Sequence, residues 1–355
     1  MNTKSIRFIL GWILNIEALL MLLPVATAVV YREEEGVAYA LVMAVCAAVG
    51  ALMTYKKPNN PSFYAKEGFV CTALGWILMS AFGCVPFMLT GEIPSFIDAM
   101  FEMVSGFTTT GASVVLNVEK LSRCTNMWRC FSHWIGGMGI LVFLLAVLPL
   151  VGGSNMQLMK AESPGPSVGK LVPKVRFTAR ILYVLYVALT VLQVLVMLLG
   201  GMTLYEALCT SFGTAGTGGF GIYGDSIAGF SPFLQWAITL FMIAFGVNFN
   251  VYFLLYMRRP KDALHCEEMH WYLGIVVAAA LMICANAYDV AMTLEGNLRQ
   301  SFFQVASIIT TTGFATTDFN LWPGFSHGIL VVLMFVGACA GSTGGGLKVS
   351  RIVIG

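Results

Sequence analysis

The sequence predicts an all-α integral membrane protein in which units of helix, re-entrant loop and helix repeat around an axis. The composition is strongly apolar, with 58% hydrophobic residues, 11% charged residues and a mean hydropathy of +0.81 over 355 residues. Eight apolar stretches are long enough to cross a bilayer, and three shorter apolar segments between them share one pattern. A soluble domain needs a more charged surface than this composition provides.

The eight long stretches have the length of transmembrane helices, because about 20 helical residues span roughly 30 Å of hydrocarbon. They cover residues 6–30, 36–55, 69–89, 131–151, 181–201, 233–257, 271–294 and 324–354. The first stretch follows Lys4 and Arg7 and so resembles a signal peptide, but its apolar run is long and lacks a clear small-residue cleavage site. We therefore expect a retained helix and eight crossings.

The basic residues predict how these spans are oriented. If the eight spans alternate, fifteen of the 20 Lys and Arg residues fall on one side. The residues on the other side are Arg32, Lys120, Arg123, Arg129 and Arg299. The positive-inside rule then places the N-terminus and the loops after spans two, four and six in the cytoplasm.

Three outward segments align without a gap when Gly111, Gly219 and Gly313 are placed in register. These segments are residues 96–111, 204–219 and 298–313. Each reads as a short helix, then Thr-rich backbone, then glycine, and each lies between two spans. The spacing of about 100 residues exceeds that of solenoid repeats, so the units are interpreted as pseudo-symmetric corners around an axis.

The three aligned segments predict an ion filter. Non-helical backbone at membrane depth is tolerated where it is buried in protein or lines a water-filled cavity. A short helix that points its C-terminal end inward favours a cation there, and Thr and Gly carbonyl oxygens can replace the water shell of the ion. The candidate ion-binding residues are Thr109, Thr110, Gly111, Thr217, Gly218, Gly219, Thr311, Thr312 and Gly313. They include no carboxylate, which favours a monovalent cation over a divalent one. The alternative is that these small residues only allow close helix packing.

The last span contains a glycine-rich stretch that should interrupt its helix, because each glycine costs about 1 kcal/mol relative to alanine. The candidate gate residues are Gly341, Ser342, Thr343, Gly344, Gly345, Gly346 and Lys348. A loop at this depth, on the cytoplasmic side of the third filter segment, can obstruct or clear a pathway. Lys348 either opposes cations or is an ordinary positive-inside anchor. A phosphate-binding loop is rejected, because Leu347 and Val349 break its pattern.

Acidic residues near the three segments suggest an outer mouth that concentrates cations. They are Asp98, Glu102 and Glu206 on the short helices, with Asp225 and Asp318 just beyond the filter segments. Solvated loop charges are the simpler account of the last two. The four histidines are scattered and suggest no transition-metal site. We expect no bound cofactor, and K⁺ or a similar monovalent cation as the transported ion at the filter residues.

Several motifs make the sequence resemble the Trk and Ktr superfamily of potassium transporters, in particular the larger Trk-type membrane subunit. Residues 108–113, 217–220 and 310–315 resemble the first three filter segments of that family, and residues 341–346 resemble its intramembrane gating loop. Residues 134–140, 161–166 and 248–250 agree as well. The resemblance covers nearly the whole chain.

The resemblance implies a potassium uptake subunit of the cytoplasmic (inner) membrane, with two extra N-terminal helices and four pore repeats around a pseudo-fourfold axis. It also implies a homodimer and a cytoplasmic, ring-forming, nucleotide-binding partner. A single glycine per repeat implies looser discrimination between K⁺ and Na⁺ than a longer Gly-Tyr-Gly filter. No nucleic-acid partner and no enzymatic activity are expected.

On this basis the chain divides into four segments. Residues 1–60 are expected to form the two N-terminal helices, residues 61–160 pore repeat 1, residues 161–262 a cytoplasmic linker with pore repeat 2, and residues 263–355 pore repeat 3 with the gating loop. The filter glycines are 108 and 94 residues apart, so a fourth would fall well past residue 355. We therefore expect a sequence truncated before its fourth repeat.

Two other classes of protein are the alternatives. A secondary transporter would also use broken helices, but its repeats usually carry discontinuous spanning helices rather than loops that enter from one side. An intramembrane enzyme would need a nucleophile with its base, or paired intramembrane carboxylates, and the sequence contains no such constellation.

Overall fold

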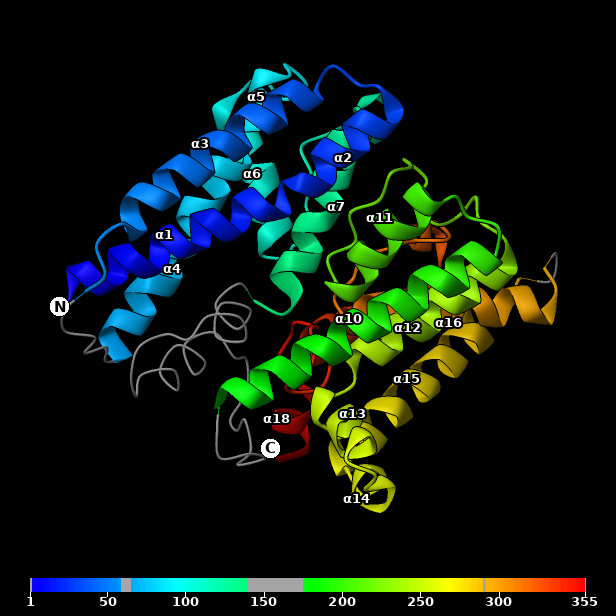
Figure 1. Cartoon of the computed structure of the whole chain (residues 1–355). Coiled ribbons are helices and arrows are strands. Elements are labelled where there is room, and N and C mark those ends of the chain that lie inside the picture. Colours follow the sequence, from blue (N-terminus) through cyan, green and yellow to red (C-terminus); the bar gives the residue numbers. More distant parts are fainter. Residues whose placement is uncertain (1, 59–64, 140–174, 290–291, 355) are drawn as a thin grey trace. The chain divides into compact units, whose positions relative to one another are not determined.

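The fold comes from a computed structural model that describes residues 2–58, 65–139, 175–289 and 292–354. All regular elements in these ranges are helices (Figure 1). The chain divides into two compact units, one formed by Met1–Ser163 with Val168–Tyr183 and the other by Pro164–Ser167 with Val184–Gly355. The predicted division of the chain at residues 60, 160 and 262 stays a prediction.

The first unit contains the elements from the N-terminus to the first filter segment and beyond it. They are α1 (Thr3–Leu20), α2 (Leu22–Tyr31), α3 (Gly36–Thr54), α4 (Ala65–Gly83), α5 (Val85–Leu89), α6 (Phe96–Phe107), the 3₁₀ helix η1 (Val118–Lys120) and α7 (Arg123–Gly137).

The second unit contains the elements of the other two filter segments and the glycine-rich loop. They are α11 (Leu204–Ala215), α12 (Pro232–Gly246), α13 (Phe249–Tyr256), α14 (Pro260–Leu264), α15 (Glu267–Asn286), α16 (Leu294–Ile309), the 3₁₀ helix η2 (Phe319–Leu321), α17 (Gly324–Val336) and α18 (Val349–Ile354). The long helix α10 (Val175–Leu199) begins in the first unit and continues into the second.

Glycines bring α1 and α3 close together in the first unit, where the two helices run side by side (Figure 1). A Cβ atom at Gly11 would lie 2.7 Å from Cβ of Met53 and 3.0 Å from the carbonyl oxygen of Gly50. A Cβ atom at Gly50 would lie 2.8 Å from the carbonyl oxygen of Gly11. Small residues at such crossings let helix backbones approach closely, as is typical of membrane helices.

Five spans of the described residues are helical, long and apolar enough to cross a membrane, if α1 is counted with α2 and α4 with α5. They cover Thr3–Tyr31, Gly36–Thr54, Lys66–Leu89, Ala179–Leu199 and Glu267–Asn286. They correspond to the first, second, third, fifth and seventh predicted spans. The seventh ends at Asn286 rather than at residue 294, because Thr293 already caps the next helix through its hydroxyl group.

The fourth predicted span is described only in part. Its helix α7 begins at Arg123, eight residues earlier than expected, because the Ser122 hydroxyl accepts a hydrogen bond from the amide of Thr125 and so caps the helix. The predicted residues 140–151 lie outside the described residues, as do residues 161–166 of the cytoplasmic linker.

The sixth predicted span is not one straight helix. Helices α12 and α13 meet at an angle of 88° at Val247 and Asn248. The side chain of Asn248 accepts a hydrogen bond from the amide of Asn250 at 2.9 Å and caps α13, which stabilises the new helix start. If the bent pair counts as one span, the described spans number six.

The helix of the eighth predicted span is interrupted at the glycine-rich stretch, as the sequence predicted. Helix α17 ends at Val336, the chain continues without a helix through the glycine-rich stretch, and α18 begins at Val349. Gly337, Gly341 and Gly346 have φ angles of 69°, 68° and 81°, which residues with a Cβ atom rarely adopt.

Candidate ion filter and gating loop

Each candidate filter segment follows a short capped helix. Helices α6, α11 and α16 begin after Ser95, Thr203 and Thr293, and each of these hydroxyl groups accepts a hydrogen bond from an amide three residues further on. In α11 the carboxylate of Glu206 also binds the amide of Thr203, which completes a capping box. The cap fixes the start of each helix, so its C-terminal end leads directly into the filter segment.

The three helices end at equivalent positions, four residues before the aligned glycine. Their last residues are Phe107, Ala215 and Ile309. The chain then passes through a left-handed residue at Thr109, Thr217 and Thr311, with φ angles of 54°, 52° and 59°. The aligned glycines Gly111, Gly219 and Gly313 also have positive φ angles, of 74°, 82° and 87°. A β-branched residue in this region is a genuine outlier, so its recurrence at one register position indicates one shared backbone design.

Two amides of each segment fold back onto the preceding helix in the same way. In repeat 1 the amides of Thr109 and Thr110 donate to the carbonyl oxygens of Gly106 and Ser105, at 3.1 and 2.9 Å. In repeats 2 and 3 the corresponding donors are Thr217, Gly218, Thr311 and Thr312, with the corresponding acceptors Thr214, Gly213, Ile308 and Ser307. The register that was set from glycines alone therefore also aligns the hydrogen bonds.

The carbonyl groups of these segments are available as ligands. Within the described parts of the chain, no hydrogen bond reaches the carbonyl oxygens of the nine candidate filter residues. Thr217, Gly218 and Thr312 are nevertheless buried. Buried carbonyl groups normally have a partner, and a dehydrated cation is one such partner.

The filter segments of repeats 2 and 3 touch each other inside the second unit. A Cβ atom at Gly219 would lie 2.0 Å from the carbonyl oxygen of Thr312, so neither space nor backbone angle permits a side chain there. Gly313 differs, because a Cβ atom at that position would meet nothing within 4 Å. Its requirement for glycine is conformational only.

The glycine-rich loop contacts both of these filter segments. The hydroxyl group of Thr217 donates to the carbonyl oxygen of Thr343 at 3.0 Å. The amide of Gly345 donates to the hydroxyl oxygen of Thr311 at 2.8 Å. Two threonines that were predicted to bind ions through their carbonyl groups therefore use their side chains to hold the candidate gate.

The bend between α12 and α13 holds the other side of the loop. The amide of Cys339 donates to the carbonyl oxygen of Gly246 at 3.0 Å, and the amide of Phe249 donates to that of Gly341 at 3.1 Å. The hydroxyl group of Thr343 donates to the carbonyl oxygen of Phe245 at 3.3 Å. The broken sixth span thus supplies backbone groups that a straight helix would have used internally.

Glu268, near the start of α15, binds the loop from a third direction. Its carboxylate accepts hydrogen bonds from the amides of Ala340 and Ser350, at 2.6 and 3.2 Å, and from the side-chain amide of Asn248 at 3.2 Å. Glu268 was not among the predicted site residues. The acidic pair Glu267 and Glu268 at the start of an apolar span was the available signal.

Lys348 ends the loop in a buried position, with a φ angle of 70°. Its ammonium group donates to the carbonyl oxygen of Gly344 within the same loop. This contact was not among the two predicted roles, which were repulsion of cations and anchoring at the cytoplasmic surface. The contact helps to fix the conformation of the loop.

One expectation about acidic residues was wrong. Glu102 was expected to lie at an open mouth and attract cations, but its side chain is buried and pairs with Arg129, with Nη2 at 2.6 Å from Oε1. The arginine neutralises the carboxylate, so the pair adds no net charge to a mouth. Glu206 binds Thr203 and Tyr223, and Asp318 caps η2 through the amide of Asn320.

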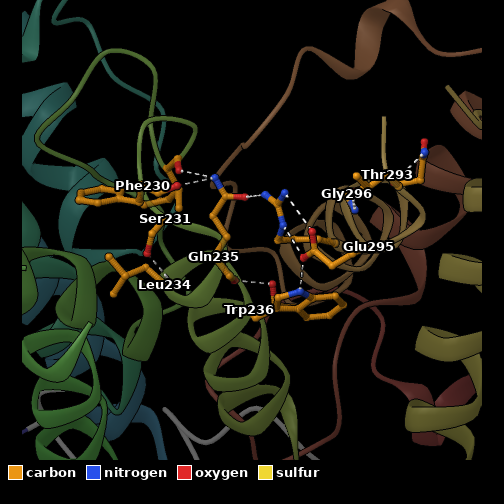
Figure 2. Close-up of polar contacts among 12 residues, drawn as sticks. Phe230, Ser231, Leu234, Gln235, Trp236, Thr293, Glu295 and Gly296 are labelled. Atoms are coloured by element: carbon orange, nitrogen blue, oxygen red, sulfur yellow. Dashed lines mark hydrogen bonds and ion pairs between the residues drawn. The ribbon is translucent and has the colours of Figure 1, made fainter. Parts of the chain in front are cut away.

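A polar network braces α16 against α12 near the start of α16 (Figure 2). Gln235 donates to the carbonyl oxygens of Ile227, Ala228 and Phe230, and its own side-chain oxygen accepts from Arg299. Arg299 and Trp236 both donate to Glu295, at 2.9 and 2.8 Å, and these hydrogen bonds hold the pKa of Glu295 below its ordinary value. The loop after the second candidate filter segment is thereby joined to α16.

Comparison with known proteins assigns the family. The family model described as TrkH, cation transport protein, matches residues 36–277 and 271–354. The chain belongs to the TrkH family of cation transport proteins. The resemblance inferred from the filter and loop motifs is thereby confirmed, and the chain is a multi-pass membrane protein. The members of this family are described as cation transport proteins.

Individual relatives cover the whole chain. The Trk system potassium uptake protein TrkH of Salmonella typhimurium is 35% identical over an alignment of 365 positions, which covers 100% of this chain and 75% of the relative. TrkH of Escherichia coli K12 is 34% identical and TrkG of the same organism 32% identical, with the same coverage. The crystal structure of the potassium transporter TrkH from Vibrio parahaemolyticus superimposes with a TM-score of 0.87 at 31% identity, over 100% of this chain and 74% of that one.

The TrkH-family fold accounts for the all-helical architecture, while the ion-binding and gating roles of single residues stay predictions. Among the described residues, no group of three or more His, Cys, Asp or Glu side chains could hold a metal ion. The potential ligands of the candidate filter are the backbone carbonyl oxygens that no hydrogen bond reaches in the described ranges.

Proposed function

We propose that the chain takes up potassium across the cytoplasmic membrane through a filter lined by backbone carbonyl groups. The observation that carries the proposal is the recurrence of one strained backbone in three segments, with left-handed Thr109, Thr217 and Thr311 each two residues before a glycine. Relatives named as potassium uptake proteins cover the whole chain. In this proposal K⁺ binds to the carbonyl oxygens of residues 109–111, 217–219 and 311–313.

The loop of residues 341–348 is the gate in this proposal. Its contacts with the side chains of Thr217 and Thr311 support the assignment, because movement of the loop breaks hydrogen bonds to two filter segments at once. The gate and the filter are then energetically linked. Glycines allow the loop to take a second conformation at low cost, since they tolerate backbone angles that other residues do not.

The assembly follows from the family resemblance. The proposal includes two N-terminal helices outside four pseudo-fourfold pore repeats, a homodimer, and a cytoplasmic nucleotide-binding subunit that sets the gate. The excess of Lys and Arg on one side of the spans supports an N-terminus in the cytoplasm.

A matched pair of glycine substitutions tests the filter assignment. Gly313→Ala strains a positive φ angle without a steric clash, whereas Gly328→Ala adds a methyl group within helix α17, where nothing lies within 4 Å. The measurement is uptake of K⁺ and Na⁺ by cells that express the full-length protein and lack their own potassium uptake systems. We expect Gly313→Ala to lower K⁺ uptake and the K⁺ to Na⁺ ratio, and Gly328→Ala to leave both unchanged. An unchanged ratio in Gly313→Ala would show that this segment is not the filter.

A further inference from the structure

A buried cluster of polar groups lies beside the first filter segment. Glu102 and Arg129 are each 1% exposed. Oε1 of Glu102 accepts from Nε and Nη2 of Arg129 at 2.7 and 2.6 Å, and from the hydroxyl group of Ser113 at 2.9 Å. Oε2 accepts from the amide of Val114 at 2.9 Å. The third guanidinium nitrogen, Nη1, donates to the side-chain oxygen of Asn126 at 2.9 Å.

This cluster joins the two ends of the filter segment. Glu102 lies on α6, before the helix ends at Phe107, while Ser113 and Val114 follow Gly111. One carboxylate therefore holds the pore helix and the backbone that leaves the filter at a set separation. Arg129, on α7, forms an ion pair with the same carboxylate.

Repeats 2 and 3 hold the same backbone by another means. The residue after the aligned glycine is Phe220 in repeat 2 and Phe314 in repeat 3, and these side chains are 3% and 1% exposed. Phe314 packs against α11, since a Cβ atom at Gly213 would lie 2.9 Å from its ring. Repeat 1 has Ala112 at this position, and Ala112 is exposed.

The positions equivalent to Glu102 carry no charge in the other repeats. They are Thr210 in repeat 2 and Gln304 in repeat 3. Gln304 donates to the carbonyl oxygen of Thr317 at 3.4 Å, and the hydroxyl group of Ser307 donates to that of Phe314 at 2.6 Å. A neutral hydrogen bond is sufficient where an aromatic ring already anchors the chain.

We propose that the Glu102–Arg129 ion pair replaces the missing aromatic anchor of repeat 1 and thereby sets the ion selectivity of this repeat. The proposal rests on the filter function proposed above. Both residues are positioning residues. The carboxylate oxygens of Glu102 already accept hydrogen bonds from Arg129, Ser113 and Val114, so they do not bind the ion themselves. The pair acts on the ion through the backbone of Thr110 and Gly111.

Neutral substitutions test the ion pair in the full-length protein. Glu102→Gln and Arg129→Gln each leave a buried, unbalanced group, which lets the exit of the filter move. We expect the ratio of K⁺ to Na⁺ uptake to fall roughly tenfold, because displaced carbonyl groups no longer match the shell of a dehydrated K⁺ ion. The apparent KM for K⁺ should rise as well, while the amount of protein in the membrane is measured in parallel. An unchanged ratio at normal protein levels would overturn the proposal.

Ser113→Ala decides the question if the Glu102→Gln and Arg129→Gln proteins do not reach the membrane. It removes hydroxyl hydrogen bonds to Glu102 and Arg129 but leaves the ion pair intact. We expect a smaller shift of the K⁺ to Na⁺ ratio in the same direction. A Ser113→Ala protein with an unaltered ratio would contradict the proposal.

A second ion pair provides the control. Arg259 and Asp262 form an exposed pair at 2.7 Å, with 65% and 50% of their side-chain surfaces accessible. Asp262→Asn should change neither the uptake rate nor the ratio, since exposed pairs contribute little.

The outcome for Gly313→Ala separates the two proposals. If that variant changes the ratio and the Glu102, Arg129 and Ser113 variants do not, the filter stands and the role of the ion pair is wrong. If Gly313→Ala leaves the ratio unchanged, the filter itself is wrong.

Discussion

Repeat 1 and repeat 3 hold the same filter backbone in different ways. Thr109 and Thr311 have φ angles of 54° and 59°, and the same amides fold back onto each pore helix. Behind this shared backbone, repeat 1 has a buried ion pair, whereas repeat 3 has the ring of Phe314 and contacts with the glycine-rich loop. The difference teaches that Thr and Gly set the local conformation, while unlike side chains can support it.

The largest expected effect separates backbone conformation from packing. Gly219→Ala adds a methyl group at 2.0 Å from the carbonyl oxygen of Thr312 and also strains a φ angle of 82°. A left-handed conformation alone costs a non-glycine residue about 1–2 kcal/mol. Because the clash is with backbone, we expect loss of K⁺ uptake, measured at equal protein levels in the membrane.

Gly313→Ala is the comparison for that prediction. It carries the same kind of backbone strain without the clash, so it should retain more uptake than Gly219→Ala. Equal activity of the two variants would show that the contact between the second and third filter segments has no importance.

The next effect removes the aromatic anchor of repeat 3. Phe314→Ala takes a fully buried ring out of the apolar cluster around α11 and α16. Truncating a buried phenylalanine typically costs about 3–5 kcal/mol in the free energy of unfolding. We expect a lower Tm in detergent solution, together with a reduced K⁺ to Na⁺ uptake ratio.

Ala112→Gly in repeat 1 is the matched control, because Ala112 is exposed and its methyl group anchors no comparable cluster. Its Tm should change much less. If Phe314→Ala were as mild as Ala112→Gly, the contrast between an aromatic and an ionic anchor would not hold.

The smallest effect concerns the loop that repeat 3 carries. Glu268→Gln keeps the size of the side chain but replaces an acceptor oxygen by a donor, so the hydrogen bond from Asn248 is lost. The negative charge that strengthens the hydrogen bond from the amide of Ala340 disappears as well. Hydrogen bonds to charged groups contribute about 1.5–3 kcal/mol. A less firmly held loop should raise K⁺ flux through reconstituted protein by about tenfold, the change that about 1.4 kcal/mol produces.

Glu267→Gln changes the neighbouring, exposed carboxylate and should leave the flux unchanged. A Glu268→Gln protein whose flux equals that of Glu267→Gln would remove Glu268 from the gating mechanism.

Much of the fold was predictable because it depends on patterns close together in the sequence. Apolar runs of about 20 residues predicted the spans. The spacing of Gly111, Gly219 and Gly313 predicted three equivalent segments, and the structure ends their helices at equivalent residues. Glycine content also predicted the break after Val336.

The bend in the sixth span was not predictable from hydropathy. Residues 233–257 form one apolar run, but Asn248 caps a new helix in its middle and turns the chain through 88°. The reason lies elsewhere in the chain, since the freed backbone groups of Gly246 and Phe249 bind the glycine-rich loop about 90 residues further on.

The sequence by itself therefore determined the membrane class through its composition and the family through its motifs. The register of its glycines supplied the three equivalent segments and the nine candidate filter residues, because backbone preference is local. Only the tertiary structure decided what supports them. Glu102 was predicted to be a mouth charge because a carboxylate on a short helix gives no sign of its partner. Arg129 lies 27 residues away, and only folding buries the two together. Burial removes water from both charges, and this changes the pair from a surface feature into a fixed support of the filter.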